Sequence, residues 1–465
     1  MAQTAAQQPR RPGVNIFDPT RPMWQLFLVF LVPLVLSNVL QAASQTFSLI
    51  FLGRLIGVNG LAAVSAVFPV IFLLFSFLIG VATGGSILIG QAHGAGDAHR
   101  VKKIAGTTLG ATLAFGIFCA ILGPMIAPAL LNGLRTPANI MDDANAYARV
   151  IFLISPAVFP YIMYTSFLRG VGDSKTPLYF LLIGTVLSIA FTPAFILGWF
   201  GLPKLGVVSV AVGALLSNLV AFTAFLIHLH RTNNPLKFDR ETAGDLLIDW
   251  HLLGQVLKIG IPTGVQVILV SLAELAVLSF VNHFGSGATA AYGAVNQIVS
   301  YVQFPAISIG MAASIFTAQA IGARREDLVV KVVHSAVGVN YAVGGAIIGT
   351  CYLFSRAILG WFITDPGTLE VAHTLLFVTL WSYLIFGNSA AISWVIRGSG
   401  DVIVPMINGI IGIWLVEVPV AYILMQRYQL VGVWLGYPIS FIVVLLLQYA
   451  YYSLYWKRQT HARLA

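Results

Sequence analysis

Two short segments of this chain read almost alike: Arg169-Gly170-Val171-Gly172-Asp173 and Arg397-Gly398-Ser399-Gly400-Asp401. Residue 169 thus matches residue 397, an offset of 228. The same offset places Gln91-Ala92-His93-Gly94-Ala95 on Gln319-Ala320-Ile321-Gly322-Ala323, and Pro177 on Pro405. Two matched segments at one offset indicate an internal repeat, so the sequence predicts a chain built from two similar halves.

The stretches between these motifs are strongly apolar. Of the 465 residues, 58% are hydrophobic and only 9% are charged, and the mean hydropathy is +0.88. A soluble chain carries roughly 25% charged residues. The apolar runs are continuous rather than alternating, which excludes a β-barrel. Runs long enough for a spanning helix, about 20 residues, occur at 26–52, 61–89, 104–130, 148–168, 178–200, 206–229, 256–282, 289–317, 332–360, 370–395, 403–425 and 430–456.

These runs predict an all-α polytopic membrane protein with twelve transmembrane helices in two pseudo-symmetric six-helix lobes. Six is an even number, so both halves enter the membrane in the same direction, as in transporters with parallel repeats. The expected divisions are an N-terminal tail (1–23), an N-lobe (24–231), a linker (232–255), a C-lobe (256–458) and a C-terminal tail (459–465).

The basic residues predict the orientation. Six of the 25 fall at one set of helix ends, namely Arg54, Arg135, Arg149, Lys204, Arg356 and Arg427, and the other 19 fall at the ends that share a side with both termini. The positive-inside rule places that side in the cytoplasm, with the protein in the cell membrane and its basic residues facing anionic lipid. No basic stripe suited to nucleic acid is present.

The first 23 residues are polar and contain no apolar core ahead of a cleavage site, so we expect no signal peptide. The Arg10–Arg11 pair is compatible with a twin-arginine signal, but a cytoplasmic anchor is the favoured interpretation. The two cysteines, Cys119 and Cys351, both lie in apolar runs, where packing is their expected role.

The Arg-Gly-x-Gly-Asp segments follow the fourth and tenth predicted helices. We interpret Arg169, Asp173, Arg397 and Asp401 as structural loop residues that pair or bond helix-end carbonyls, while the glycines permit tight turns. A phosphate-binding loop is the alternative, but neither a Walker pattern nor a strand before the loop is present. Without a nucleotide motif, transport energy has to come from an ion gradient.

Uncharged polar residues line one face of two predicted helices. Ser37, Gln41, Ser44 and Ser48 recur at helical spacing beside Asn38 and Gln45, and the eighth helix carries Asn296, Ser300 and Gln303. Such residues either bond neighbouring helices or line a wet cavity, and we favour the cavity. Further lining is expected from Tyr164, Gln266 and Asn388. Aromatic rings suited to a cation, with interface packing as the alternative, are Tyr161, Tyr164, Tyr292, Tyr301, Trp381 and Trp394.

Two carboxylates, Glu274 and Glu417, lie deep within apolar runs. Glu274 precedes Asn282 by eight residues and Glu417 precedes Arg427 by ten, which places them about 12 and 15 Å below the same membrane surface. Because a charge there costs about 2.5–3.5 kcal/mol on insertion scales, such residues usually face a cavity. We expect one or both of Glu274 and Glu417 to bind the coupling ion; a helix–helix contact near Pro419 is the alternative for Glu417.

Taken in order, these features resemble the MATE (multidrug and toxic compound extrusion) family, of the bacterial NorM and DinF type. The resemblance rests on Thr46-Phe-Ser-Leu-Ile-Phe-Leu-Gly-Arg-Leu55, the Gln-Ala-x-Gly-Ala and Arg-Gly-x-Gly-Asp segments, and Ile261-Pro262. It implies a V-shaped two-lobe fold that exports organic cations in exchange for H⁺ or Na⁺ by rocking between inward- and outward-open states.

The chain also departs from that family. Ser48 stands where many bacterial members carry an acid, and Ser188 and Thr192 stand where an Asn and an Asp often precede a proline. Val270 occupies the spacing of a functional glutamate in the seventh helix, and Glu274 follows one turn later. The resemblance therefore implies ion coupling in the C-lobe, with a preference for H⁺.

The expected function is thus a non-enzymatic antiporter for small molecules, a monomer that needs no cofactor or metal beyond its coupling ion. The alternatives are a flippase for lipid-linked precursors and an exporter of a non-cationic metabolite. A flippase needs a strongly cationic cavity, but no Lys or Arg lies deep in the predicted helices. An intramembrane enzyme is disfavoured because the histidines are scattered. A channel is disfavoured because the repeat forms two lobes rather than a ring.

Overall fold

The computed structural model describes residues 13–459, 461, 463 and 464. The first half holds the helices α1 (Met23–Phe51), α2 (Val58–Gly94), α3 (Ala98–Gly133), α4 (Met141–Gly170), α5 (Lys175–Leu197), α6 (Ser209–Arg231) and the short α7 (Arg240–Gly244). The second half holds α8 (Trp250–Asn282), α9 (Ser286–Gly322), α10 (Glu326–Val339), α11 (Gly345–Leu353), α12 (Ser355–Gly360), α13 (Pro366–Thr379), α14 (Ser382–Gly398), α15 (Ile403–Ile410) and α16 (Val418–Leu454). The predicted tail residues Arg10 and Arg11 lie outside the described residues.

Twelve membrane-spanning segments follow from these elements, as predicted. Ten continuous helical stretches of the described chain are long and apolar enough to cross a membrane, and the pair α13–α14, bent by 44°, provides another. The last stretch reverses direction at Gln429, whose backbone φ is +51°. Beyond that residue the chain runs back along itself: Ser440 donates to the carbonyl of Gly412, and Gln448 to that of Pro405. One stretch is therefore a hairpin of two spans.

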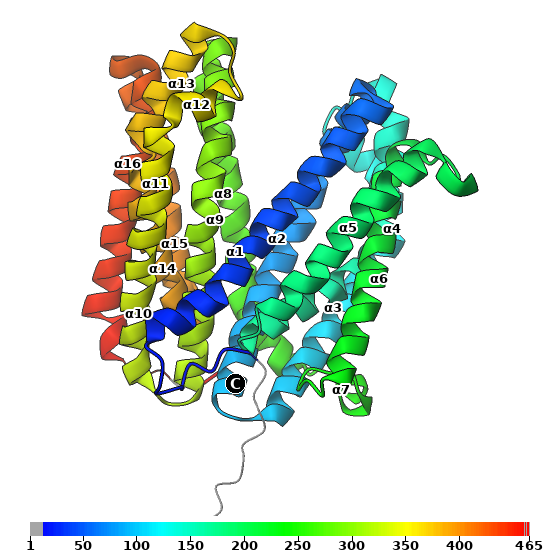
Figure 1. Ribbon diagram of the computed structural model, residues 1–465, viewed down its shortest axis with the longest axis vertical. Coiled ribbons are helices and arrows are strands. Elements are labelled where there is room, and N and C mark those ends of the chain that lie inside the picture. The colour runs from blue at the N-terminus through cyan, green and yellow to red at the C-terminus, as the bar shows by residue number, and fades with distance from the viewer. Residues whose placement is uncertain (1–12, 460, 462, 465) are drawn as a thin grey trace, which may run out of the picture.

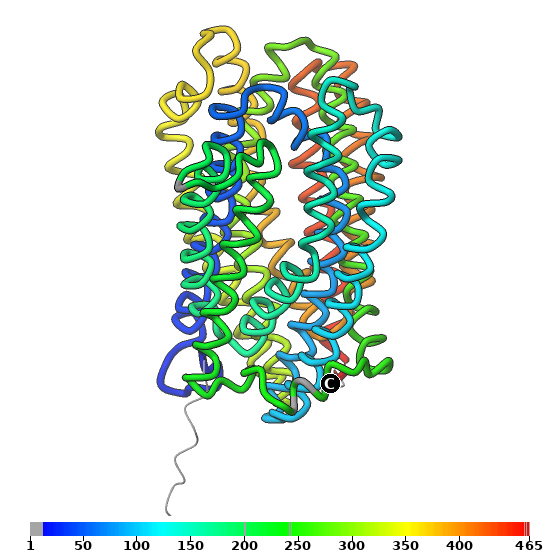
Figure 2. Tube along the Cα trace, turned by 90° about the vertical axis from the view of Figure 1, so that its right-hand side faces the viewer, coloured from blue at the N-terminus to red at the C-terminus, as the bar shows by residue number. Residues whose placement is uncertain are grey.

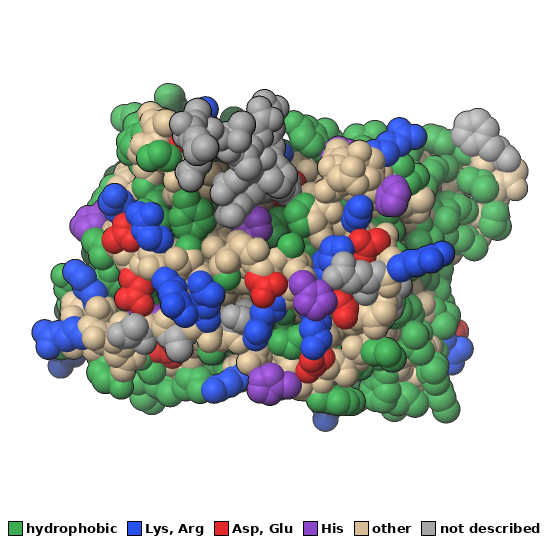
Figure 3. Space-filling model, turned by 90° about the horizontal axis from the view of Figure 1, so that it is seen from below, with side chains coloured by type: hydrophobic (Ala, Val, Ile, Leu, Met, Phe, Trp, Pro, Cys, Tyr) green, Lys and Arg blue, Asp and Glu red, His purple; other side chains and the backbone are tan. Residues whose placement is uncertain are grey.

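The helices form two bundles that splay apart at one end and meet at the other (Figure 1). Helices α1–α6 form the N-lobe and α8–α16 form the C-lobe. We call the end where the lobes meet the lower end; the described parts of both terminal segments and α7 lie there. Figure 2, turned by 90°, also shows these segments at that end. Basic and acidic side chains gather on the lower face (Figure 3).

The first helix of each lobe begins against the other lobe. Phe27 and Phe30 of α1 pack on the ring of Phe316 in α9, with ring centroids 5.6 and 5.5 Å away. The matching helix α8 packs on α2 at Gly80 and Gly260, where a Cβ on either glycine would overlap the other's backbone. Small residues let membrane helices approach this closely, because van der Waals packing replaces the hydrophobic effect in lipid.

The repeated glutamines join the lobes at the lower end. Gln91 in α2 donates to the carbonyls of Gly398 and Ser399 at 3.3 Å, and Gln319 in α9 donates to the carbonyl of Gly170 at 2.8 Å. Gly94 lies against the backbone of Gln319, and Gly322 lies against that of Gln91. We call this reciprocal contact between residues 91–94 and 319–322 the inter-lobe seam. Both glutamine side chains are buried, so the seam is closed in this structure.

Four further contacts lie at the lower end around the seam. The backbone N–H of Val14 donates to Gly172, and that of Leu464 donates to Oε1 of Gln91. The linker is tied to α3 by ion pairs between Lys102 and Asp239 at 2.7 Å and between Lys103 and Asp249 at 2.8 Å. The connection between the lobes is therefore held against the N-lobe.

The Lys102–Asp239 contact gives a prediction for the linker. The hydrogen bond from Lys102 and those from Thr242 hold the pKa of Asp239 at about 2, below its ordinary 3.8. A lowered pKa means that the ionised carboxylate stabilises the fold above pH 3.8 and that this contribution is lost as the pH falls toward 2. Linker amide protection, corrected for intrinsic exchange, is therefore expected to be flat between pH 5 and 8.

Replacement of Asp239 by asparagine is expected to remove about 1 kcal/mol from the local opening free energy. Hydrogen exchange of the linker amides then becomes roughly fivefold faster. The matched control is Asp327→Asn, which breaks an exposed pair with Arg325 outside the linker and leaves linker exchange unchanged. Equal linker exchange in wild type and Asp239→Asn would show that this pair does not hold the linker.

Candidate ion and substrate site

A cavity of about 470 Å³ lies in the C-lobe between α8, α9, α14 and the α15–α16 hairpin, and Phe72 of α2 also lines it. Six of the residues predicted to bind an ion or line a cavity do line it: Gln266, Glu274, Asn296, Ser300, Gln303 and Glu417. They come from α8, from α9 and from the π-helical segment Ile411–Glu417 that joins α15 to α16. The helical spacing in α9 therefore does mark a cavity wall.

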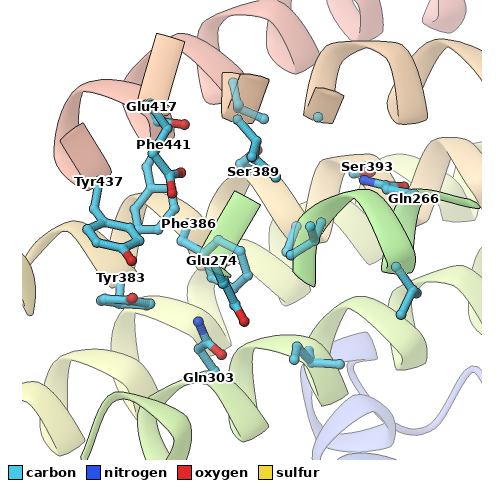
Figure 4. A pocket seen from close by; sticks show the side chains of 18 of the residues that line it. Gln266, Glu274, Gln303, Tyr383, Phe386, Ser389, Ser393, Glu417, Tyr437 and Phe441 are labelled. Atoms are coloured by element: carbon cyan, nitrogen blue, oxygen red, sulfur yellow. The ribbon is translucent and has the colours of Figure 1, made fainter. Parts of the chain in front are cut away.

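The two glutamates enter this cavity from different sides. Glu274 is exposed to the opening and lies between Gln303 and Phe386, whereas Glu417 is buried behind Phe441 with only 5% of its surface exposed (Figure 4). Among the described lining residues they are the only acids. Two carboxylates in one partly closed space can accept protons or attract a cation, and removing a proton from one disfavours ionisation of the other.

Aromatic rings form the wall beside the carboxylates. Tyr383 and Phe386 of α14 each have their ring centroid 5.2 Å from that of Phe441 in α16. The hydroxyls of Tyr292 and Tyr437 lie 3.3 Å apart. Faces of such rings attract organic cations, because the ring quadrupole is negative above its plane. The wall thus suits a flat or cationic ligand.

The lower part of the cavity holds a cation, Arg397. Its guanidinium donates to Oγ1 of Thr263 at 3.3 Å, to Oγ of Ser393 at 3.4 Å and to Oε1 of Gln266. It also lies 5.6 Å from the ring of Trp394. The sequence placed no Lys or Arg deep in the helices; the structure corrects this, because Arg397 points from the end of α14 back into the bundle.

The other Arg-Gly-x-Gly-Asp residues lie at the lower end. Asp173 accepts hydrogen bonds from the backbone of Lys175 and Thr176 at the start of α5. Asp401 accepts one from the hydroxyl of Tyr451 at 2.6 Å. Arg169 is half-buried at the end of α4. Asp173 thus stabilises the start of α5 and Asp401 connects its loop to α16, which is in keeping with the structural role expected for these two residues.

The polar residues predicted on α1 lie outside the C-lobe cavity. Asn38 donates to Oγ of Ser308 at 2.9 Å and so connects α1 to α9. Ser48 donates to the carbonyl of Ser44 in its own helix. Gln41 and Gln45 are exposed. The α1 stripe therefore contributes a helix–helix contact and exposed amides.

Two other predicted lining residues are packed between helices. Asn388 is buried and accepts a hydrogen bond from Nδ2 of Asn340 at 2.9 Å, while its neighbour Ser389 lines the cavity. Tyr164 is buried in the N-lobe among Phe167, Phe222 and Phe225. Neither Asn388 nor Tyr164 lines the cavity.

The N-lobe is packed differently from the C-lobe. Rings of Tyr161, Tyr164, Phe180, Phe222 and Phe225 contact one another between α4, α5 and α6. The hydroxyl of Thr192, at one of the positions where the family often has an acid, is buried without a hydrogen-bond partner. Among the described residues, the acidic side chains that line the candidate site therefore belong to the C-lobe.

Sequence reasoning missed several lining residues, among them Tyr383, Phe386, Ser389, Ser393, Tyr437, Ser440 and Phe441. Ser389, Ser393 and Arg397 recur every four residues, which is one helical face and was a usable signal. The α16 residues gave none, because an apolar run hides which face is turned inward. No group of three or more His, Cys, Asp or Glu side chains suited to a metal occurs among the described residues.

The paired six-helix lobes and the charged cavity inside one of them define a polytopic membrane transporter of the two-lobed type. The family model described as MatE matches residues 33–194 and 262–423, one copy in each lobe. The chain therefore belongs to the MatE family.

Relatives and solved structures agree with this assignment. The chain is 47% identical over 444 residues to the "Probable multidrug resistance protein YoeA" of Bacillus subtilis, covering 95% of this chain and 96% of that one. It is 25% identical to the "Multidrug export protein MepA" of Staphylococcus aureus, covering 77% and 79%. A structure titled "Outward-facing conformation of a multidrug resistance MATE family transporter of the MOP superfamily" superposes with a TM-score of 0.84 at 21% identity, covering 93% and 94%.

The different positions of Asn388 and Asn296 give a prediction. Asn388→Ala removes a buried helix–helix hydrogen bond and is expected to lower the midpoint of thermal unfolding in detergent by roughly 2 °C, leaving ligand affinity within about twofold. Asn296→Ala, the matched variant inside the cavity, is expected to weaken binding of a fluorescent organic cation and to change the midpoint less. If Asn388→Ala weakens binding as much as Asn296→Ala, Asn388 contacts the ligand.

Proposed function

We propose that this protein is a secondary antiporter that exports amphipathic organic cations in exchange for protons. The proposal rests on the cavity in which Glu274 and Glu417 face one space beside a wall of aromatic rings. The names of the relatives in Bacillus subtilis and Staphylococcus aureus, a multidrug resistance protein and a multidrug export protein, support the export of drugs. We expect it to work as a monomer in the plasma membrane.

The charge distribution supports an orientation. Basic side chains gather on the lower face (Figure 3), and the described parts of both terminal segments lie at the same end (Figure 1). By the positive-inside rule this is the cytoplasmic face. The lobes are closed at the inter-lobe seam below and splayed above, and with this orientation we propose that the structure represents an outward-open state. Export then requires the seam to open and the upper ends to approach, which is alternating access by rocking of two lobes.

Coupling follows from competition for the carboxylates. In the outward-open state, protons from outside neutralise Glu274 and Glu417 and release a bound cation. In the inward-open state, loss of those protons to the cytoplasm restores the charge that attracts the next cation. A proton needs only the carboxylates, whereas Na⁺ needs several fixed oxygens around it at once. We therefore propose H⁺, and a sodium-driven exchange is a distinct outcome of the test.

The flippase alternative is less well supported. A diphosphate group calls for several cations, and among the described residues that line the cavity Arg397 is the one Lys or Arg. That residue bears instead on which compounds the antiporter carries.

The proposal is tested in proteoliposomes loaded with a fluorescent organic cation. An imposed pH gradient is expected to drive its exchange in wild type, and Glu274→Gln and Glu417→Gln are each expected to lower the gradient-driven rate at least about tenfold, since the amide cannot exchange a proton. The matched control is Glu370→Gln, an exposed glutamate paired with Arg356 outside the cavity, which should retain the wild-type rate.

Three results would contradict the proposal. Exchange driven only by a sodium gradient would replace H⁺ by Na⁺ as the coupling ion. Undiminished pH-driven exchange in both glutamate variants would remove these carboxylates from the coupling site. Absence of cation movement under either gradient would overturn cation export itself.

A further inference from the structure

The cavity is polarised, with acids toward one part and a lone cation at the other. Among its described lining residues only Glu274, Glu417 and Arg397 are charged. Gln266, which contacts Arg397, precedes Glu274 by eight residues on α8, so the two lie about 12 Å apart along the helix axis. Figure 4 shows Gln266 and Ser393 on the opposite side of the cavity from Tyr383 and Tyr437.

Arg397 has no anionic hydrogen-bond partner among the described residues. Its side chain is 4% exposed, and its three hydrogen bonds go to the neutral oxygens of Thr263, Gln266 and Ser393. Two of these bonds, at 3.3 and 3.4 Å, are longer than the usual 2.7–3.2 Å. Asp401, on the same loop, already accepts from Tyr451. A guanidinium has five N–H donors, and a buried one is stabilised most by an anion.

The side chains around Arg397 are those of an anion site. Ser389, Ser393 and Arg397 stand on one face of α14, four residues apart, and all three line the cavity. Hydroxyls and a guanidinium can bind a carboxylate through several donors at once, and Arg does so in a bidentate geometry. Trp394, against the guanidinium, limits its reorientation.

We propose that Arg397 is the subsite for a carboxylate, and that the cavity therefore selects zwitterionic aromatic compounds over simple cations. The protonated amine of such a compound lies toward Glu274, its ring system against Tyr383, Phe386 and Phe441, and its carboxylate on Arg397. This inference rests on the proposed export function and narrows its substrate class. It also gives the buried guanidinium an anionic hydrogen-bond partner, which adds to the longer-range attraction of Asp401.

The test uses two probes with the same fluorophore: a rhodamine that carries a free benzoate, and the methyl ester of that rhodamine, which is a cation without the carboxylate. Binding to purified protein is measured by fluorescence anisotropy, without any gradient. Wild type is expected to bind the free acid at least about tenfold more tightly than the ester, the size of a hydrogen bond to a charged group. Unlabelled benzoate is expected to compete with the acid and not with the ester.

Arg397→Gln is expected to remove this preference while leaving ester affinity within about twofold, and Arg397→Lys to keep part of it because a lysine retains charge but not the bidentate fork. Ester binding in the same variant reports folding. Arg325→Gln, in the exposed pair with Asp327, is the control and should keep the wild-type preference.

The outcomes separate the inference from the proposed function. Equal affinity of wild type for acid and ester overturns the carboxylate subsite, and so does an Arg397→Gln variant that still binds the ester and keeps the wild-type preference for the acid. If Arg397→Gln does not fold, benzoate competition in wild type decides. Export of the ester under a pH gradient tests the proposed function on its own, and it can fail or succeed independently of the binding preference.

Discussion

The arrangement of the two lobes depends on a reciprocal contact in which each lobe donates one buried glutamine to the other. Gln91 bonds the end of α14 and Gln319 bonds the end of α4, and in each case the acceptor is a glycine of an Arg-Gly-x-Gly-Asp segment. A buried amide without a partner is costly, so opening the contact requires water or other partners to replace these bonds. Gly94 and Gly322 have no Cβ, which leaves room for this close contact between the lobes. The repeated motifs thus hold the lower ends of the two lobes together.

Within this frame the two lobes have diverged in chemistry. The N-lobe is filled by contacting aromatic rings around Tyr164, and serine or threonine stands at positions where related proteins often have acids. The C-lobe encloses a cavity with two carboxylates and a guanidinium. On the function proposed above, the ligand and the coupling ion bind in the C-lobe. The two lobes therefore have similar backbone arrangements but differ in the chemistry of their side chains.

Sequence alone predicted most of the fold, because span number follows from apolar length and the two lobes follow from a repeat at one offset. It also placed Glu274 and Glu417 at similar depth, and both line one cavity. It could not decide between Asn388 and Ser389, since adjacent helical residues differ by about 100° in direction and only the neighbouring helix fixes which is inward. Nor could it place Arg397, because an arginine at a helix end can bond carbonyls, reach the surface or turn into the bundle.

The central claim is that export requires the inter-lobe seam to open. A Cβ at Gly90 would lie 3.1 Å from that of Ala318 across the lobes, near the 3.5–4.5 Å of a disulfide. The measurement is pH-driven exchange by Gly90→Cys/Ala318→Cys protein in which Cys119 and Cys351 are replaced by alanine, before and after oxidation. Oxidised protein is expected to bind probe from the upper side without exchanging it, and to recover on reduction. Undiminished exchange by protein shown to be cross-linked would contradict the account.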